Sequence, residues 1–503
     1  MIRQAKTENG IVEGIWAADP RITAFKGIPF AAPPTGKNRW RAPQPAADWQ
    51  GVYHADHFGP ISMQEIPGHN AQDIYTREWH VDSGIPMSED SLYLNVWTPA
   101  KTAQETLPVL VWFFGGGLQC GYTAEMEFDG ERLARRGIVV VTVGYRLNVF
   151  GFMAHPLLRA EQPETPTNFG HLDQQAGLRW VKRNIRAFGG DPDKITIAGQ
   201  SAGGGSVMLH LTSPESAGLF QGAIVDSGAF HHPYDTRGIG MLRTTQKAEA
   251  DGCSFFAYLG VRTLEEARAI PAQELYDRYE AFHGLFTSVI DGKFAVGDPV
   301  DLFCAGRRLP VPVLAGNTTN EFFLSVTPED AKTLLPAAIG SAHTQEYIDA
   351  CGGLSDPEAF TRNSRMRAVE YSVRLMFEAN DRLSNGLPCY YYQFDPDIPG
   401  WDNPGTFHSS DLWFWFETLA KCWRPFVGRH YDLARMMCHY WANFVKNGDP
   451  NGQDSDGTPL PVWQPYTHAA PYAMRMTGQG PIMDHDMPGA PLTVLLHAAL
   501  EKL

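Results

Sequence analysis

The sequence predicts an α/β protein in which helices flank a central, mostly parallel sheet, and three observations predict it. First, the apolar segments 108–114, 138–143 and 194–198 alternate with helical segments near 130–136 and 172–188. Strands that are apolar on both faces and alternate with helices are typical of a parallel sheet. Second, the N-terminal hundred residues alternate apolar and polar positions between turns, which predicts short antiparallel strands there. Third, the region from about 234 to 375 has helical periodicity and more charge, which predicts helical insertions.

Shorter signals predict the later part of the sheet. Segments 222–225, 311–316 and 390–394 are strand-like, and we expect the last two to be the final strands of the sheet. The strand at 311–316 would interrupt the helical excursion at about 234–375. Because no Gly/Ser-rich or Pro-rich linker divides the chain, we expect a single interrupted domain over residues 1–503.

The composition narrows the class of partner. The 503 residues are 43% hydrophobic and 19% charged, with a net charge of −15. This excludes wholesale disorder, and an acidic surface argues against nucleic acid as the main partner. No apolar run approaches the roughly 18 residues of a membrane helix, and the N-terminus shows no signal peptide. We therefore expect a small-molecule substrate, no membrane or nucleic-acid partner, and a monomer or small homo-oligomer.

The cysteines and histidines do not suggest a metal centre. Seven cysteines form an odd set without a C-x-x-C pair, which predicts reduced thiols in a cytoplasmic protein rather than a zinc site or a disulfide framework. His231 and His232 are adjacent, a poor arrangement for joint metal ligation, and we expect them at the surface or in a pocket wall. The sequence thus predicts no metal and no organic cofactor.

The sharpest motif is G-Q-S-A-G at residues 199–203, between the predicted strand at 194–198 and a helical run. In a strand–turn–helix setting, G-x-S-x-G is typical of a serine held in a strained turn at the carboxyl edge of a parallel sheet. Small residues two positions before and after Ser201 let the strand and helix approach closely. The helix N-terminus behind the serine favours developing negative charge. Ser201 is therefore the predicted nucleophile.

A nucleophilic serine of this kind needs N–H groups that bind the reacting carbonyl oxygen. Three glycines, Gly115 to Gly117, follow the predicted strand at 108–114, at the same edge of the sheet. Without side chains they can turn their N–H groups toward that oxygen. We expect N–H groups of these glycines and, as a third donor, the N–H of Ala202 to form the oxyanion hole.

An acid and a histidine must complete the set, and in this arrangement the chain order is serine, acid, histidine. Among 17 histidines, His408 lies in a loop shortly after the strand at 390–394, where a residue at the sheet edge would fall. Glu321 follows the strand at 311–316 by five positions and is the expected acid. The residue pattern alone does not separate Glu321 from Asp301.

These residues and other segments resemble the type B carboxylesterase family, which includes bacterial carboxylesterases and the cholinesterases. The resemblance runs along nearly the whole chain and is specific because its motifs occur in the same order. They are F-K-G-I-P-F-A-A-P-P-T-G (25–36), S-E-D-S-L-Y-L-N-V-W (88–97), W-F-F-G-G-G (112–117), N-F-G-H-L-D-Q-Q (168–175), F-G-G-D-P (188–192), G-Q-S-A-G-G (199–204) and N-F-V-K-N-G-D-P-N (443–451).

The resemblance implies an α/β-hydrolase fold, a triad of Ser201, Glu321 and His408, and oxyanion donors at Gly116, Gly117 and Ala202. It also implies two structural salt bridges, Arg39 with Glu89 and Arg146 with Asp173, and a supporting role for Ser227 beside the triad. The chain departs from the family pattern at several positions. Many relatives carry Glu where this chain has Gln200, His or Tyr where it has Phe114, and Gly where it has Phe322, and secreted relatives carry a disulfide cysteine in place of Ser91.

The expected activity is hydrolysis of carboxylic esters through an acyl-enzyme. We expect the substrate pocket to be lined by Phe114, Leu118, Phe230, Tyr234 and Trp413. An aromatic lining suits small or aromatic esters, including hydroxycinnamoyl (feruloyl-type) esters. The alternatives are a catalytically idle binding module of the same fold, and lipase, amidase or transacylase activity with the same triad.

Overall fold

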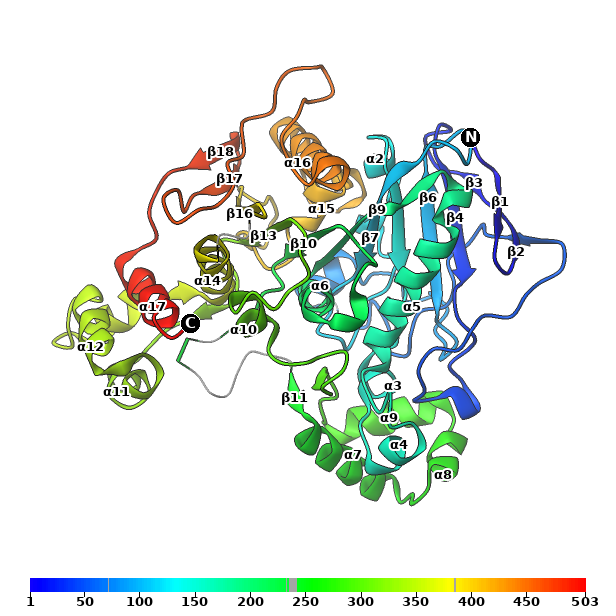
Figure 1. Ribbon diagram of the computed structural model, residues 1–503, viewed down its shortest axis with the longest axis horizontal. Coiled ribbons are helices and arrows are strands. Elements are labelled where there is room, and N and C mark those ends of the chain that lie inside the picture. Colours follow the sequence, from blue (N-terminus) through cyan, green and yellow to red (C-terminus); the bar gives the residue numbers. More distant parts are fainter. Residues whose placement is uncertain (71, 232, 235–241, 384–385) are drawn as a thin grey trace.

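The computed structural model describes residues 1–70, 72–231, 233–234, 242–383 and 386–503. Within these residues an eleven-stranded sheet crosses the molecule (Figure 1). Its strands, in spatial order, are β18 (Gly480–Asp484), β17 (Ala473–Thr477), β16 (Cys389–Asp395), β13 (Val313–Thr318), β10 (Gly222–Asp226), β9 (Gly190–Gln200), β7 (Leu107–Phe113), β8 (Val139–Val143), β6 (Tyr93–Thr98), β4 (Thr23–Pro29) and β3 (Ile15–Trp16).

The middle of the sheet is parallel and its edges are antiparallel. The strands from β8 through β7, β9, β10, β13 and β16 to β17 pair in parallel. The pairs β3–β4, β4–β6, β6–β8 and β17–β18 are antiparallel. The mostly parallel sheet is thereby confirmed. The antiparallel N-terminal strands are confirmed as well, except that β2 (Gly10–Glu13) pairs with β5 (Val52–His54) in parallel. The expectation that 311–316 and 390–394 provide the final strands is wrong, because β17 and β18 extend the sheet beyond β16.

The period-two pattern of β7 shows why helices cover both faces of the sheet. Val109, Val111 and Phe113 pack in one core with α5 (Phe169–Asn184), α6 (Ala202–Thr212) and α14 (Ala368–Arg382). Leu110 and Trp112 point the other way, into a second core with α2 (Glu131–Ala134), α15 (Leu412–Trp415) and α16 (Gly428–Asn447). Successive strand side chains alternate between faces, so an apolar strand requires apolar cover on both sides.

The remaining described elements lie around this core. A small sheet joins β1 (Gln4–Thr7), β2 (Gly10–Glu13) and β5 (Val52–His54). Short helices α1 (Ile74–Glu78), α3 (Asn148–Phe152) and α4 (Pro156–Glu161) lie in the N-terminal half. Helices around β13 include α7 (Thr245–Leu259), α8 (Leu264–Ala269), α9 (Ala272–Phe282), α10 (Pro299–Cys304), α11 (Pro328–Thr333), α12 (Leu335–Ala350) and α13 (Pro357–Asn363), with short strands β11 (Arg243–Thr244), β12 (Val289–Ile290), β14 (Phe323–Leu324) and β15 (Met366–Arg367).

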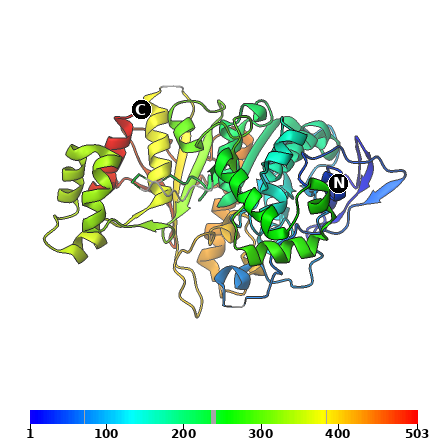
Figure 2. The ribbon, with the colours of Figure 1, turned by 90° about the horizontal axis from the view of Figure 1, so that it is seen from below.

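These helices form two groups at different places on the molecule. Helices α7, α8 and α9 lie below the N-terminal half of the sheet, beside α4 (Figure 1). Helices α11 and α12 lie with the C-terminal α17 (Ala490–Leu500) at one end of the long axis, opposite the small N-terminal sheet (Figure 2). The two expected salt bridges are both present and buried. Arg39 Nε lies 2.5 Å from Glu89 Oε1, and Arg146 Nη2 lies 2.7 Å from Asp173 Oδ1.

Candidate active site

Ser201 sits in a tight turn between the end of β9 and the first residue of α6. Its backbone has φ 55° and ψ −124°, a conformation that is strained for a residue with a side chain. A Cβ on Gly203 would lie 2.1 Å from the carbonyl oxygen of Phe113, and one on Gly199 would lie 2.4 Å from that of Gly203. Glycine at both positions therefore lets helix α6 approach β7 and β9 closely enough to hold the serine.

The glycine run after β7 lies against this turn. A Cβ on Gly115 would lie 3.0 Å from the Cβ of Ser201, so the glycines and the serine share one wall. Gly116 and Gly117 have φ of 101° and 64°, which turns the chain sharply. Within the described residues, neither of their N–H groups donates to another protein atom. Ala202 provides the first N–H of α6, which has no partner inside the helix. Gly116 and Gly117 thus border the same cavity as Ser201, and Ala202 is the residue that follows this serine.

Glu321 and His408 are brought together from two loops at the carboxyl edge of the sheet. Glu321 follows β13 and His408 follows β16, and Glu321 Oε2 accepts a hydrogen bond from His408 Nδ1. The other Glu321 oxygen accepts hydrogen bonds from Ser227 Oγ at 2.8 Å and from the Thr318 N–H at 2.9 Å. The buried carboxylate is therefore fully engaged and holds the imidazole so that Nε2 faces away from Glu321.

The residue before the serine contacts the same histidine. Gln200 is buried, and its Nε2 lies 3.1 Å from His408 Nε2 and 2.6 Å from Ser409 Oγ. Its amide can donate to the lone pair of a neutral imidazole, which a glutamate at this position cannot do. Phe322 packs its ring edge-on to His408, with the ring centroids 4.4 Å apart. The His408 ring is thereby held on three sides.

One cavity borders Ser201, and a second lies on the other side of the next residue, Ala202. The larger has a volume of about 360 Å³ and is bordered by Ser201, the three glycines, Gln200 and His408. Its outer wall consists of aromatic, acidic and other residues from the segment 64–80 and beyond: Gln64, Glu65, Asp73, Tyr75, Trp79, His80, Cys120, Glu125, Phe128, Phe322 and Leu412. The smaller cavity, of about 50 Å³, lies beyond Ala202 and is lined by Leu118, Gly205, Phe230 and Asp298, among others.

The ionisable groups of the larger cavity make it acidic and exclude a competing thiol. Burial raises the pKa of Cys120 to about 12, so its thiol is protonated at neutral pH and is a poor nucleophile. Burial lowers the pKa of His80, but the nearby carboxylates of Glu125, Asp73 and Glu65 outweigh burial and raise it overall. His80 Nε2 lies 3.2 Å from Glu125 Oε1.

This geometry can be compared with known proteins. A model of the carboxylesterase family matches residues 2–487. The chain belongs to the carboxylesterase family. It is 31% identical to the para-nitrobenzyl esterase of Bacillus subtilis over 476 residues, covering 88% of this chain and 90% of that protein. It is 37% identical to the fumonisin B1 esterase of Sphingopyxis macrogoltabida over 474 residues, covering 88% and 82%.

Solved structures agree with the sequence relatives. The Geobacillus stearothermophilus carboxylesterase EST55 superposes with a TM-score of 0.76 at 29% identity, over 98% of this chain and 100% of that one. A para-nitrobenzyl esterase structure gives a TM-score of 0.79 at 27% identity, over 98% and 99%. The α/β-hydrolase fold of this carboxylesterase is therefore shown, and the chain is an enzyme of ester hydrolysis.

Of the five expected pocket residues, two line the smaller cavity and three border neither of the two cavities. Leu118 and Phe230 line the smaller cavity. Phe114 is buried against Tyr145 at a ring-centroid distance of 4.2 Å, and Trp413 lies behind Trp79 at 6.2 Å. Neither borders either cavity, because Phe114 faces the second core and Trp413 forms a second layer behind the wall. Tyr234 is buried and does not border these cavities, and its neighbours 235–241 lie outside the described residues.

The outer wall of the larger cavity was missed from sequence. Tyr75, Trp79 and His80 belong to an irregular stretch that holds only the short helix α1. No hydrophobic period marks such a segment, and the only signal would have been its density of aromatic and acidic residues. Phe322, noted as a departure from the family pattern, lines the same cavity.

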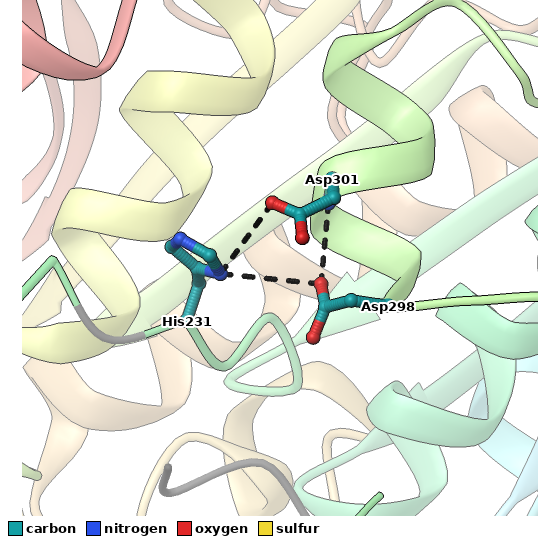
Figure 3. A group of neighbouring side chains, drawn as sticks. All are labelled: His231, Asp298 and Asp301. Atoms are coloured by element: carbon teal, nitrogen blue, oxygen red, sulfur yellow. Dashed lines mark hydrogen bonds and ion pairs between the residues drawn. The ribbon is translucent and has the colours of Figure 1, made fainter. Parts of the chain in front are cut away.

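The alternative acid, Asp301, lies elsewhere in the esterase. It belongs to a group with His231 and Asp298 (Figure 3), in which His231 Nδ1 lies 3.9 Å from one oxygen of each carboxylate. Asp298 Oδ1 already caps α10 by accepting from the N–H groups of Val300 and Asp301. The group is thus explained as a helix cap beside a histidine, and His232 lies outside the described residues.

The described part of the chain contains no helix with the length and hydrophobicity of a membrane span.

Proposed function

We propose that this carboxylesterase acts through an acyl-enzyme on Ser201, with His408 as the base and Glu321 as the acid of the triad. The observation that carries the proposal is the strained serine in one cavity wall with a histidine whose Nδ1 is bonded to a buried carboxylate. His408 Nε2 accepts the proton of Ser201 Oγ as that oxygen attacks the ester carbonyl. Glu321 fixes the tautomer and stabilises the imidazolium that forms.

The remaining steps use the same groups. The N–H groups of Gly116, Gly117 and Ala202 bind the tetrahedral oxyanion, and each such donor lowers the barrier by roughly 3 kcal/mol. The imidazolium then protonates the leaving alcohol, and the acyl group stays on Ser201. Water repeats the sequence on the acyl-enzyme and releases the carboxylic acid. Every proton that leaves an oxygen passes through His408 Nε2.

The two cavities suggest which part of the ester each one receives. The leaving oxygen must lie within reach of His408, which borders only the larger of these two cavities. The acyl group then points past Ala202 into the smaller cavity of about 50 Å³. We therefore propose esters with a short acyl group and a bulky or aromatic alcohol. A feruloyl-type ester would require its aromatic acyl group to fit the smaller cavity, and it is the second candidate because Phe230 lines that cavity.

The charge of the larger cavity adds a further preference. Glu65, Asp73 and Glu125 line it, so an alcohol group that carries negative charge should bind weakly.

We also propose a cytoplasmic location, supported by seven cysteines that are all free thiols, as is usual in a reducing compartment.

An ester panel tests the proposal. Benzyl acetate has an aromatic alcohol and a short acyl group, whereas methyl ferulate has an aromatic acyl group and a small alcohol; 4-nitrophenyl acetate and decanoate vary acyl length. We expect benzyl and nitrophenyl acetates to be the better substrates, and Ser201→Ala to lower kcat by about three orders of magnitude or more. Preferential turnover of methyl ferulate would reverse the cavity assignment. Full activity of Ser201→Ala would show that Ser201 is not the nucleophile.

A further inference from the structure

Two buried carboxyl groups that the proposed reaction does not use lie directly behind the triad. Asp226 is the last residue of β10, and Asp411 lies three residues after His408, at the start of α15. Both residues are completely buried. Two aspartates in such a place require an explanation, because a buried carboxylate is stable only when partners compensate its lost hydration.

The donors around the pair are too few for two ionised carboxylates. Asp411 Oδ2 accepts from the Tyr392 hydroxyl at 3.1 Å and from Trp415 Nε1 at 3.4 Å. Tyr392 is also within hydrogen-bonding reach of Asp226, but its single hydroxyl proton can serve only one of the two carboxylates. Among the described residues, Asp411 Oδ1 and both Asp226 oxygens have no N–H or O–H donor. A side-chain hydrogen bond between Asp226 and Asp411 raises the pKa of Asp226 and lowers that of Asp411, so one added proton would join the two groups.

The charges around the pair also favour that proton. Burial raises the pKa of Asp411 to about 6, and the charge of Glu321 adds to the effect. Burial, followed by the charges of Asp411 and Glu321, raises the pKa of Asp226 well above its usual range. The titratable groups that face the pair are Glu321 from the loop after β13 and Tyr392 from β16. Neither supplies positive charge, and the nearby His408 bonds to Glu321 rather than to either aspartate.

The pair connects the segments that carry the triad. The carbonyl oxygen of Asp226 accepts the N–H of Ser201 at 2.9 Å, and the next residue, Ser227, donates to Glu321. Asp411 is in the same loop as His408. A bond between the two side chains therefore connects the turn at Ser201, and Ser227 beside Glu321, to the loop that carries His408.

We propose that Asp226 is a protonated carboxylic acid that donates its proton to the Asp411 carboxylate, and that this bond positions the serine turn and the histidine loop relative to each other. The two side chains are positioning residues and do not touch substrate. The kinetic part of this inference rests on the proposed function, whereas the shared proton does not.

The direct test is infrared difference spectroscopy at pH 7.5. The spectrum of the wild type minus Asp226→Asn should show the carbonyl stretch of a protonated carboxylic acid, which the amide cannot give. The matched control is Asp301→Asn, which removes an exposed aspartate and should show only a carboxylate difference. Absence of the acid band from the wild-type-minus-Asp226→Asn difference spectrum overturns the proposal, whatever the activity.

A second test uses the pH dependence of stability. The unfolded chain loses the Asp226 proton above its ordinary pKa of about 4, whereas the folded chain keeps it to higher pH. Wild-type stability is therefore favoured at acid pH and falls as pH rises through this window, relative to a side chain that does not titrate. The Tm of Asp226→Asn minus that of the wild type should increase from pH 5 to pH 8. A difference that is constant with pH contradicts a shared proton.

Kinetics distinguish positioning from simple folding support. The amide of Asp226→Asn can still donate to Asp411, so its kcat/KM should stay within about threefold of the wild type at pH 7.5. Asp226→Leu removes the bond and should lower kcat by about tenfold or more in the folded protein, because the reaction slows when catalytic groups are misplaced. Equal kcat for both variants overturns the positioning role. If Ser201→Ala were fully active, the proposed function would fail while the infrared result would stand.

Discussion

At the scale of single residues, Glu321 is distinguished from Asp301 by its neighbours rather than by its place in the sequence. Both follow β10 in chain order, but only Glu321 bonds to His408. We predict that Glu321→Gln lowers kcat by about 10³-fold or more, because an amide no longer stabilises the imidazolium. Steady-state kinetics on 4-nitrophenyl acetate measures this. Asp301→Asn is the control and should keep wild-type kcat. If Asp301→Asn lost activity and Glu321→Gln did not, the acid of the triad would be Asp301 rather than Glu321.

Gln200 sets the charge beside the base. In Gln200→Glu a carboxylate replaces the amide 3.1 Å from His408 Nε2, and a nearby negative charge favours the imidazolium. Because only the neutral imidazole accepts the Ser201 proton, the acid limb of the kcat/KM profile should move to higher pH. A one-unit move would lower kcat/KM by about tenfold on that limb. A pH–rate profile from pH 5 to 9 checks this, and an unmoved acid limb would show that Gln200 does not contact the working base.

At the scale of elements, the packing of α6 against the sheet depends on Gly203 more than on Gly205. A Cβ on Gly203 would meet the Phe113 carbonyl oxygen at 2.1 Å, whereas the nearest atom to a Cβ on Gly205 is 3.7 Å away. We predict that Gly203→Ala destabilises the fold by about 3 kcal/mol or more through overpacking. Gly205→Ala should be neutral, or stabilising by up to about 1 kcal/mol through helix propensity. Urea unfolding compares them, and equal stabilities would contradict the described approach of α6 to β7.

The elements that could be predicted from sequence are those with a strong period or a steric requirement. The buried strands of the sheet centre and the turn at Ser201 both belong to this class, because apolar runs and closely spaced glycines have few other uses. Strands β17 and β18 were missed: they are short, lie at the sheet edge and follow a turn-rich stretch. The wall at 64–80 was missed since an irregular segment carries no period.

The pocket shows the same limit at finer resolution. Phe114 and Trp413 are aromatic and lie within a few positions of candidate active-site residues in the sequence, but backbone direction decides which way each side chain faces. Phe114 and Leu118 both pack in the second core, but only Leu118, four residues later with φ 61°, also lines the smaller cavity. Pairings between distant loops, such as Ser227 with Glu321, needed the folded chain or a family resemblance.

At the scale of the whole molecule, buried neutral histidines should make the fold acid-sensitive. His171 is completely buried between Gln174 and Ser288, and burial lowers its pKa to about 4. Below about pH 6.5 the unfolded chain binds a proton that the folded chain does not. Stability should therefore fall as pH decreases from 6.5 toward 4, with His171 contributing about 2 kcal/mol of loss by pH 5.

Urea unfolding at pH 7 and pH 5 measures this loss. The variant His171→Gln cannot titrate and should lose less stability between the two pH values. His57→Gln, at an exposed site, is the control and should lose as much as the wild type. If His171→Gln and the wild type lost the same amount, His171 would not be the acid-sensitive group.

The measurement that tests the central claim most directly is the location of the covalent intermediate. The enzyme is mixed with 4-nitrophenyl acetate, quenched in acid during the first turnover, digested and analysed by mass spectrometry. We predict an acetyl group on the peptide that contains Ser201 in the wild type, an increased yield of it in Glu321→Gln if deacylation is slowed more than acylation, and none in Ser201→Ala. An acetyl group on Cys120 or another residue, formed fast enough to account for turnover, would contradict the account.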